Sequence, residues 1–373
     1  MAVPFVLATL AFTGVAQAHI AAFAKGMYCE NGTDPKNPNY NNNAVVAPLF
    51  NFTLEELWFQ RERGCDRVPP PEGVFLDVPA GGSFTVDLAN NQAFSRLSYE
   101  GKLTSLWPDG GDHPDNWNGG GVGEGCIDEA GYMHVQDEQH AQGTAFAISY
   151  HSDLNQVNLE NLVVFSVLEH TPWHREATYQ VPKGLPACPP GGCTCAWLWV
   201  PRGCGQPNIY MQGFKCQVSG ATSITPLAKA QQPAQCEDDT SKCVAGAKQM
   251  IVWNQLTGNN VFPKSGQTPA YNSRNGFRPG AQEDIFAGEP AAPASSSASS
   301  SVSVGVTSSP TAVTRVESVT TSKPALTSDG SFTIQPVTFS TSTTTRASMS
   351  SGGGNGNPAT VTVTVTAPGG CSK

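Results

Sequence analysis

The residue with the greatest chemical potential in this sequence is His19, because of what precedes it. Residues 1–18 are almost wholly apolar, carry no charged side chain and end in Ala16-Gln17-Ala18. An apolar run that ends in an A-x-A pattern is typical of a secretory signal peptide. It is too short and too often interrupted to favour a membrane span. Cleavage after Ala18 would make His19 the first residue of the mature chain.

A histidine at an N-terminus can offer a metal ion two nitrogen atoms, its α-amine and one ring nitrogen. The pKa of an α-amine is about 8, so part of it is unprotonated at neutral pH. A second imidazole would complete a T-shaped set of three nitrogens. Amine and imidazole ligands in such a planar set favour copper over magnesium, calcium or a tetrahedral zinc site. The alternative is that His19 only marks where the signal protease cuts.

The rest of the sequence favours a β-rich scaffold for such a site. The chain has 373 residues, of which 14% are charged, with 38 Gly and 29 Pro, so long amphipathic helices are poor candidates. One run, residues 54–63, predicts a short helix. Short strands separated by turn-rich loops predict an all-β fold, an immunoglobulin-like antiparallel β-sandwich with long disulfide-linked loops. The predicted strands are residues 83–88, 144–150, 162–168, 195–200 and 214–218.

Cysteine usage supports an oxidising compartment. Ten of the 11 cysteines lie between residues 19 and 287, and this even number predicts five disulfides whose pairing the sequence leaves open. Two sequons, at Asn31 and Asn51, predict N-glycosylation on the same secretory route. The ten cysteines are Cys29, Cys65, Cys126, Cys188, Cys193, Cys195, Cys204, Cys216, Cys236 and Cys243, which leaves Cys371 unpaired.

Composition divides the chain into a signal peptide (1–18), a folded domain (19–287) and a tail (288–373). From residue 291 onward, 35 of 83 residues are Ser or Thr, and such a segment buries too little apolar area to fold. We therefore expect a disordered, O-glycosylated tail. The net charge of -9 argues against nucleic acid as a partner. No other segment is apolar enough to predict a membrane span.

Seven runs taken together resemble one protein family. They are HIAAFAKGMYC (19–29), LWFQRERGCD (57–66), PAGGSFTVDL (79–88), GTAFAISYHSD (143–153), GGCTCAWLWVPRGCGQPNIYMQGFKC (191–216), KQMIVWNQLTGNN (248–260) and GAQEDIF (280–286). These runs resemble the fungal lytic polysaccharide monooxygenases of auxiliary activity family fourteen. The likeness covers residues 19–287.

The resemblance implies that residues 19–287 form the catalytic domain of a secreted, extracellular copper enzyme. It implies a monomer that uses O2 or H2O2 and an external electron donor to cleave recalcitrant polysaccharide, above all xylan coating cellulose. In that family a histidine brace holds one copper ion, and a tyrosine occupies the axial side. The matching positions are His19, His134 and Tyr210. His140, which lies nearer the following strand, is the alternative second histidine.

Weaker candidates surround these residues in the sequence. Gln206, four residues before Tyr210, could approach a copper-bound oxygen species. From Leu103 to His174 there are eleven acids and no Lys or Arg, which is either a solvated loop or a field that attracts cations. Three tryptophans could stack on sugars or belong to the core: Trp107, Trp117 and Trp173. We expect His113 to be solvated and His151 to be exposed, and His170 and His174 are minor candidates for the substrate face.

Three other functions stay open at this point. The first is a non-catalytic histidine-brace protein that binds copper at the cell surface. The second is a structural or adhesive wall glycoprotein, which would not bind copper tightly. The third is a glycoside hydrolase that uses two of the clustered acids and needs neither copper nor a reductant.

Overall fold

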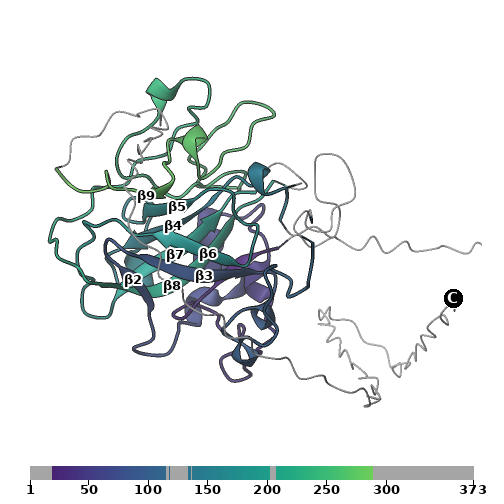
Figure 1. The fold of residues 1–373 in the computed structure, drawn as a ribbon. Coiled ribbons are helices and arrows are strands. Elements are labelled where there is room, and N and C mark those ends of the chain that lie inside the picture. Colours follow the sequence, from purple (N-terminus) through teal and green to yellow (C-terminus); the bar gives the residue numbers. More distant parts are fainter. Residues whose placement is uncertain (1–18, 115–116, 118–132, 136, 202–206, 289–373) are drawn as a thin grey trace, which may run out of the picture. The chain divides into compact units, whose positions relative to one another are not determined.

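The computed structural model describes residues 19–114, 117, 133–135, 137–201 and 207–288 (Figure 1). The predicted signal peptide and tail, Cys126, Cys204 and Gln206 lie outside these residues. The chain divides into two units after residue 300, and the second unit, residues 301–373, also lies outside the described residues.

Two β-sheets form the framework of the described domain, which confirms the expected all-β class (Figure 1). Neighbouring strands are antiparallel, except that β2 pairs with β8 in parallel among the described strands. The three-stranded sheet has the order β1 (Ala21–Phe23), β3 (Ser83–Ala89) and β6 (Glu176–Gln180). The six-stranded sheet has the order β2 (Leu76–Pro79), β8 (Tyr210–Ser219), β7 (Cys193–Trp199), β4 (Thr144–Ser149), β5 (Val163–Leu168) and β9 (Gly280–Ala281).

The six-stranded sheet is buried on both faces, which explains why its central strands are so apolar. Along β4, Phe146 and Ile148 pack into one core cluster, which they share with the three-stranded sheet. The alternate residues Ala145 and Ala147 pack into a second cluster on the opposite face. This alternation follows from the period of two in a β-strand.

Only the first part of the helix predicted at residues 54–63 forms an α-helix. Thr53 and Glu56 form a capping box that starts α1 (Leu54–Leu57). The chain then continues as the 3-10 segment η2 (Trp58–Arg63), because Phe59 and Gln60 adopt left-handed φ angles of 49° and 57°. The Gln60 amide donates to the carbonyl oxygens of Val45 and Met211, so tertiary contacts override the helical pattern.

The other helical segments are single 3-10 turns that punctuate the loops. They are η1 (Ala44–Val46), η3 (Cys65–Arg67), η4 (Gln92–Phe94), η5 (Tyr99–Gly101), η6 (Glu138–His140), η7 (Leu154–Gln156), η8 (Thr240–Lys242) and η9 (Ser273–Asn275). No helix among the described residues is long and apolar enough to cross a membrane.

Four disulfides link described loops and strands, as the cysteine content predicts. Eight of the ten predicted cysteines are paired in the structure, and the other two, Cys126 and Cys204, lie outside the described residues. The pairs are Cys29–Cys65, Cys188–Cys193, Cys195–Cys216 and Cys236–Cys243.

Candidate metal centre

Two aromatic residues mark one end of the six-stranded sheet. Strand β8 begins at Tyr210, β7 ends at Trp199 and β4 begins at Thr144, and the register pairs Trp199 with both of the others. Directly paired residues project to the same face of a sheet. The rings of Trp199 and Tyr210 accordingly stack, with their centroids 4.5 Å apart.

His134 lies against this aromatic pair. Its Nε2 atom is 3.4 Å from the Tyr210 hydroxyl oxygen, and its ring meets Trp199 edge-on at a centroid distance of 5.5 Å. The side chain is buried, with only 7% of its surface exposed. The φ angle of His134 is 56°, a left-handed value that is uncommon for a residue other than glycine. Such strained conformations concentrate at functional sites.

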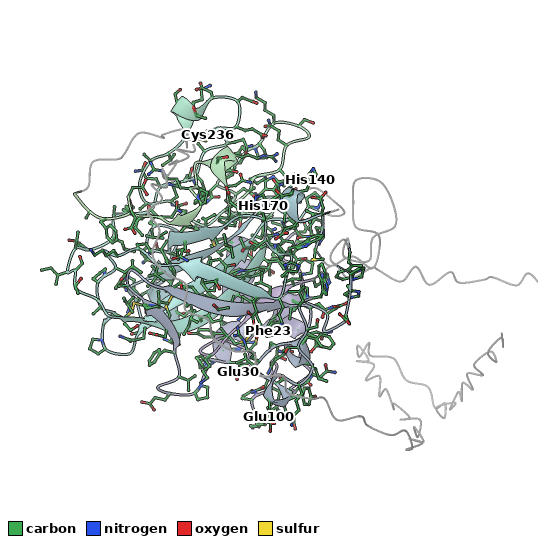
Figure 2. All side chains as sticks on the ribbon, viewed as in Figure 1. Phe23, Glu30, Glu100, His140, His170 and Cys236 are labelled. Atoms are coloured by element: carbon green, nitrogen blue, oxygen red, sulfur yellow. A yellow bond between two sulfur atoms is a disulfide. The ribbon has the colours of Figure 1, made fainter. Side chains whose placement is uncertain are left out.

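His140 occupies a different environment. It ends the turn η6, and about two fifths of its side chain is exposed at the edge of the folded part (Figure 2). Its Nδ1 atom is 2.6 Å from an oxygen of Asp137, so one ring nitrogen is engaged by a carboxylate. The structure therefore brings His134, and not His140, into contact with Tyr210.

His19 lies two residues before β1, half-buried at the start of the described chain. The next residue, Ile20, is fully buried, and Ala21 pairs with Ala89 at the end of β3. The backbone that follows His19 is therefore anchored in the three-stranded sheet.

Residues 171–174 connect the end of β3 to the aromatic pair of Trp199 and Tyr210. The hydroxyl of Thr171 lies 2.7 Å from that of Thr144, the strand partner of Trp199. Three residues later, the ring of His174 contacts Trp107 at a centroid distance of 4.8 Å. Pro108, the residue after Trp107, accepts a hydrogen bond from the backbone of Asn90, which directly follows β3. These contacts place the start of β1 at the same end of the domain as Tyr210.

Burial also governs the chemistry of the Tyr210 phenol. Only 2% of this residue is exposed, and burial raises the pKa of its hydroxyl, an effect that the nearby charge of Arg63 only partly offsets. Without a bound metal the phenol is therefore neutral at physiological pH. The Arg63 guanidinium is held in place by hydrogen bonds to the carbonyl oxygens of Ala44 and Ala47.

The three tryptophans that could stack on sugars differ in their burial. Trp107 and Trp173 are 1% and 4% exposed, so they belong to the core. Trp117 is half-buried and stacks on His113, with centroids 3.6 Å apart and an interplanar angle of 4°. His113 also lies 2.8 Å from the Asp109 carboxylate, and 24% of its side chain is exposed, so the expectation that it is solvated holds only in part. The stacking of His113 on Trp117 could not be foreseen from the sequence.

The other histidines and the acidic stretch have environments of their own. His170 is exposed. His151, for which we expect exposure from the sequence, is instead half-buried and bonds to Gln156. Of the eight acids in residues 109–138, Asp109 and Asp137 pair with histidines, and four others lie outside the described residues: Asp115, Glu124, Asp128 and Glu129. Within the described part of the chain, no group of three or more His, Cys, Asp or Glu side chains could hold a metal ion.

Trp199 is the residue of this site that sequence reasoning missed. The signal for it was the alternation in strand β7, which places Trp197 and Trp199 on one face of the sheet. Its ring contacts both His134 and Tyr210, so it sets the relative position of these two side chains.

Replacing Trp199 with Ala should lower the free energy of unfolding by about 3–5 kcal/mol, because it leaves a large cavity under two aromatic neighbours. Chemical denaturation of the folded chain measures this loss. The matched control, Trp117→Ala, removes a half-buried ring and should cost less than about 2 kcal/mol. Equal losses for the two variants would contradict the supporting role of Trp199.

Comparison with known proteins places this architecture in a family. The model of the family described as lytic polysaccharide monooxygenase AA14 matches residues 1–368. The chain belongs to this family. The sequence runs that resemble the AA14 family lie within residues 19–287, and the match of the family model extends beyond this range.

Curated AA14 relatives show the same similarity. The AA14 family lytic polysaccharide monooxygenase B of Trametes coccinea is 36% identical over 292 residues, which cover 76% of this chain and 66% of the relative. The enzyme of the same name from Pycnoporus cinnabarinus is 35% identical over 295 residues, with 76% and 74% covered. The one from Talaromyces rugulosus is 33% identical over 294 residues, with 73% and 94% covered. The chain thus spans just under two thirds of the first relative's length.

Proposed function

We propose that this chain is a secreted, copper-dependent polysaccharide monooxygenase that cleaves xylan coating cellulose. The observation that carries the proposal is the buried contact between His134 Nε2 and the Tyr210 hydroxyl, 3.4 Å apart. This contact lies at the end of the domain where β1, which follows His19, also begins. Family membership supports the same activity.

The donor set at this end fits copper. Removal of residues 1–18 would free the α-amine of His19, so that His19 offers two nitrogens and His134 a third. Imidazole and amine nitrogens suit Cu(II), whereas magnesium and calcium prefer oxygen ligands. Bound copper would accept an electron from an external donor and activate O2 or H2O2 for attack on a strong C–H bond.

The protein's own residues hold and orient this centre. His19 and His134 would hold the copper ion through their nitrogens, and the Tyr210 phenol would lie beside it, 3.4 Å from His134 Nε2. Trp199 stacks on Tyr210 and contacts the edge of His134, so neither ring can turn without disturbing the core. Met133 and Val135, the buried neighbours of His134, fix its backbone. Partners of this kind tune a metal as strongly as its direct ligands do.

The proposed reaction inserts one oxygen atom into a C–H bond beside a glycosidic linkage. With O2 as the oxidant, two electrons and two protons from the external donor reduce the second oxygen atom to water. With H2O2, the peroxide itself supplies the oxidising equivalents, and water again leaves. The C–O bond to the neighbouring sugar then breaks as the new hydroxyl becomes a carbonyl, and its proton ends on the departing sugar oxygen, which cuts the chain.

Several features support a secretory route. The predicted signal peptide precedes His19, and four disulfides join the described loops and strands. Of the two predicted glycosylation sites, Asn51 is exposed, whereas Asn31 is half-buried and its side-chain oxygen accepts a hydrogen bond from Gln92. The proposal includes one folded domain followed by an O-glycosylated tail. It also includes a monomeric enzyme.

The processed, copper-loaded chain should release oxidised xylo-oligosaccharides from xylan-coated cellulose when a reductant is present. Mass spectrometry of the soluble products checks this, with matched reactions that lack copper or reductant. Equal release in those controls would indicate a hydrolase. No release from a fully copper-bound chain would instead favour a non-catalytic copper-binding protein of the cell surface. Products from bare cellulose and none from coated cellulose would overturn the xylan assignment.

A further inference from the structure

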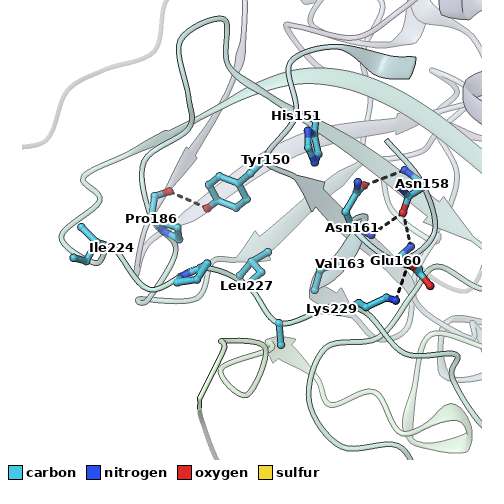
Figure 3. A pocket seen from close by; sticks show the side chains of 12 residues that line it. Tyr150, His151, Asn158, Glu160, Asn161, Val163, Pro186, Ile224, Leu227 and Lys229 are labelled. Carbon is cyan, nitrogen blue, oxygen red and sulfur yellow. Dashed lines mark hydrogen bonds and ion pairs between the residues drawn. The ribbon is translucent and has the colours of Figure 1, made fainter. Parts of the chain in front are cut away.

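A cavity of about 630 Å³ opens at the opposite end of the strands from the candidate metal centre (Figure 3). Tyr150 follows the last residue of β4 and Val163 begins β5, whereas Thr144 lies at the other end of β4. Six residues of extended strand separate the two ends by roughly 20 Å. This cavity therefore belongs to a different surface from the proposed catalytic site.

One wall of the cavity is formed mainly by apolar side chains. Pro186, Ile224 and Leu227 line it beside Tyr150, whose hydroxyl donates to the Pro186 carbonyl oxygen at 2.8 Å (Figure 3). Ile224 is 96% exposed, although it is a large aliphatic residue. Contiguous apolar surface, rather than one exposed residue, marks docking sites, and Ile224 adjoins Pro186 and Leu227 in the lining of this cavity.

The opposite rim of the cavity is polar. Lys229 lies on this rim, and its ammonium group pairs with the Glu160 carboxylate at 2.9 Å. The described lining residues therefore offer no unpaired lysine or arginine to an anion. A neutral and partly apolar occupant therefore suits this cavity better than a phosphate or a carboxylate.

The described chain ends at the apolar wall. The backbone of Ala287 donates to the carbonyl oxygen of Pro226 at 2.9 Å, and Leu227 forms a β-bridge with Phe286. Pro226 and Leu227 both line the cavity. The last described residues of the chain, 286–288, therefore lie directly beside the cavity.

The sequence that follows has the pattern of a polyproline ligand. Residues 289–294 read Glu-Pro-Ala-Ala-Pro-Ala, with Pro290 and Pro293 three positions apart. A polyproline II helix has 3 residues per turn and rises about 3.1 Å per residue, so both prolines would share one face. Grooves lined by aromatic residues recognise this PxxP arrangement at a low entropic cost.

We propose that residues 289–294 dock in this cavity as a polyproline II segment. Pro290 and Pro293 pack against Tyr150, Pro186 and Leu227. Docking fixes the beginning of the Ser/Thr-rich tail at the end of the domain remote from His134 and Tyr210. The docking itself does not depend on the proposed catalytic function.

Replacing both prolines with Ser should expose the cavity wall. In the full chain, Pro290→Ser with Pro293→Ser should speed hydrogen exchange of the backbone amides in residues 224–230 at least about threefold, because a docked segment restricts local opening. The matched control, Pro310→Ser with Pro324→Ser, changes two later prolines of the tail and should leave this exchange unchanged. Equal exchange in the wild type and both variants would overturn the docking.

Proteolysis tests the same contact from the cavity side. Elastase cleaves after small residues, so cutting at Ala291–Ala294 of the full chain should be slow and should accelerate at least about threefold in Ile224→Asp. Phe262→Asp changes another exposed apolar residue, 77% exposed and outside the cavity lining, and should have no effect. Unchanged cutting in Ile224→Asp would contradict the proposal. So would protection of residues 224–230 that appears only when xylohexaose is added, since that result assigns the cavity to a glycan.

Discussion

A chain that retains even one residue before His19 will bind copper far more weakly than the processed chain. The extra residue converts the α-amine into an amide, which removes one of the three proposed nitrogen ligands and leaves His19 with its ring alone. We expect the Kd for Cu(II) to rise at least about a hundredfold, or ~2.7 kcal/mol. Isothermal titration with Cu(II) measures the two constants directly.

The comparison requires two chains that differ only at this end. One begins at His19 and the other begins with Ala18 before it, and unfolding curves of the metal-free forms show whether both are equally folded. If the two folded chains bind copper with the same Kd, the α-amine is not a ligand and the brace hypothesis fails.

The second large effect is expected for His134. Replacing it with Ala should abolish the Cu(II) EPR spectrum of a three-nitrogen site and all copper-dependent release of oxidised sugars. The physical reason is that His134 supplies the third nitrogen, from a buried position beside Tyr210. EPR at substoichiometric copper reports the ligand set independently of activity.

His140→Ala is the matched control, since it removes an imidazole six residues away in the same loop. His140 is half-exposed and faces Asp137, so its loss should leave the EPR spectrum and the Kd for copper unchanged. The reverse pattern, with His140→Ala disrupting the spectrum and His134→Ala leaving it intact, would exchange the two assignments.

Much of the sheet framework could be predicted from periodicity alone. All five predicted strands are present as β3, β4, β5, β7 and β8, because their apolar residues face one or both buried clusters. Strand β6 was missed although its residues alternate between buried and exposed. Strand β1 has only three residues, all buried, so no alternation could reveal it.

The candidate site depends on long-range contacts that periodicity does not encode. His134 and Tyr210 are 76 positions apart, and the sequence paired them only through the family resemblance. The partial burial of His113 has the same origin, because its loop sequence looks hydrophilic while the fold stacks the ring on Trp117. Likewise, the break at Phe59 and Gln60 follows from tertiary hydrogen bonds that a helical pattern cannot anticipate.

In the proposed reaction, this end of the domain inserts oxygen from an oxidant into a polysaccharide. The most direct measurement is the isotopic origin of the oxygen atom in the released products. Mass spectrometry should find ¹⁸O in oxidised xylo-oligosaccharides when the copper-loaded, processed chain acts with reductant under ¹⁸O2, or with labelled H2O2. Products whose new oxygen comes from labelled water, released at the same rate without copper, would contradict the account and identify hydrolysis instead.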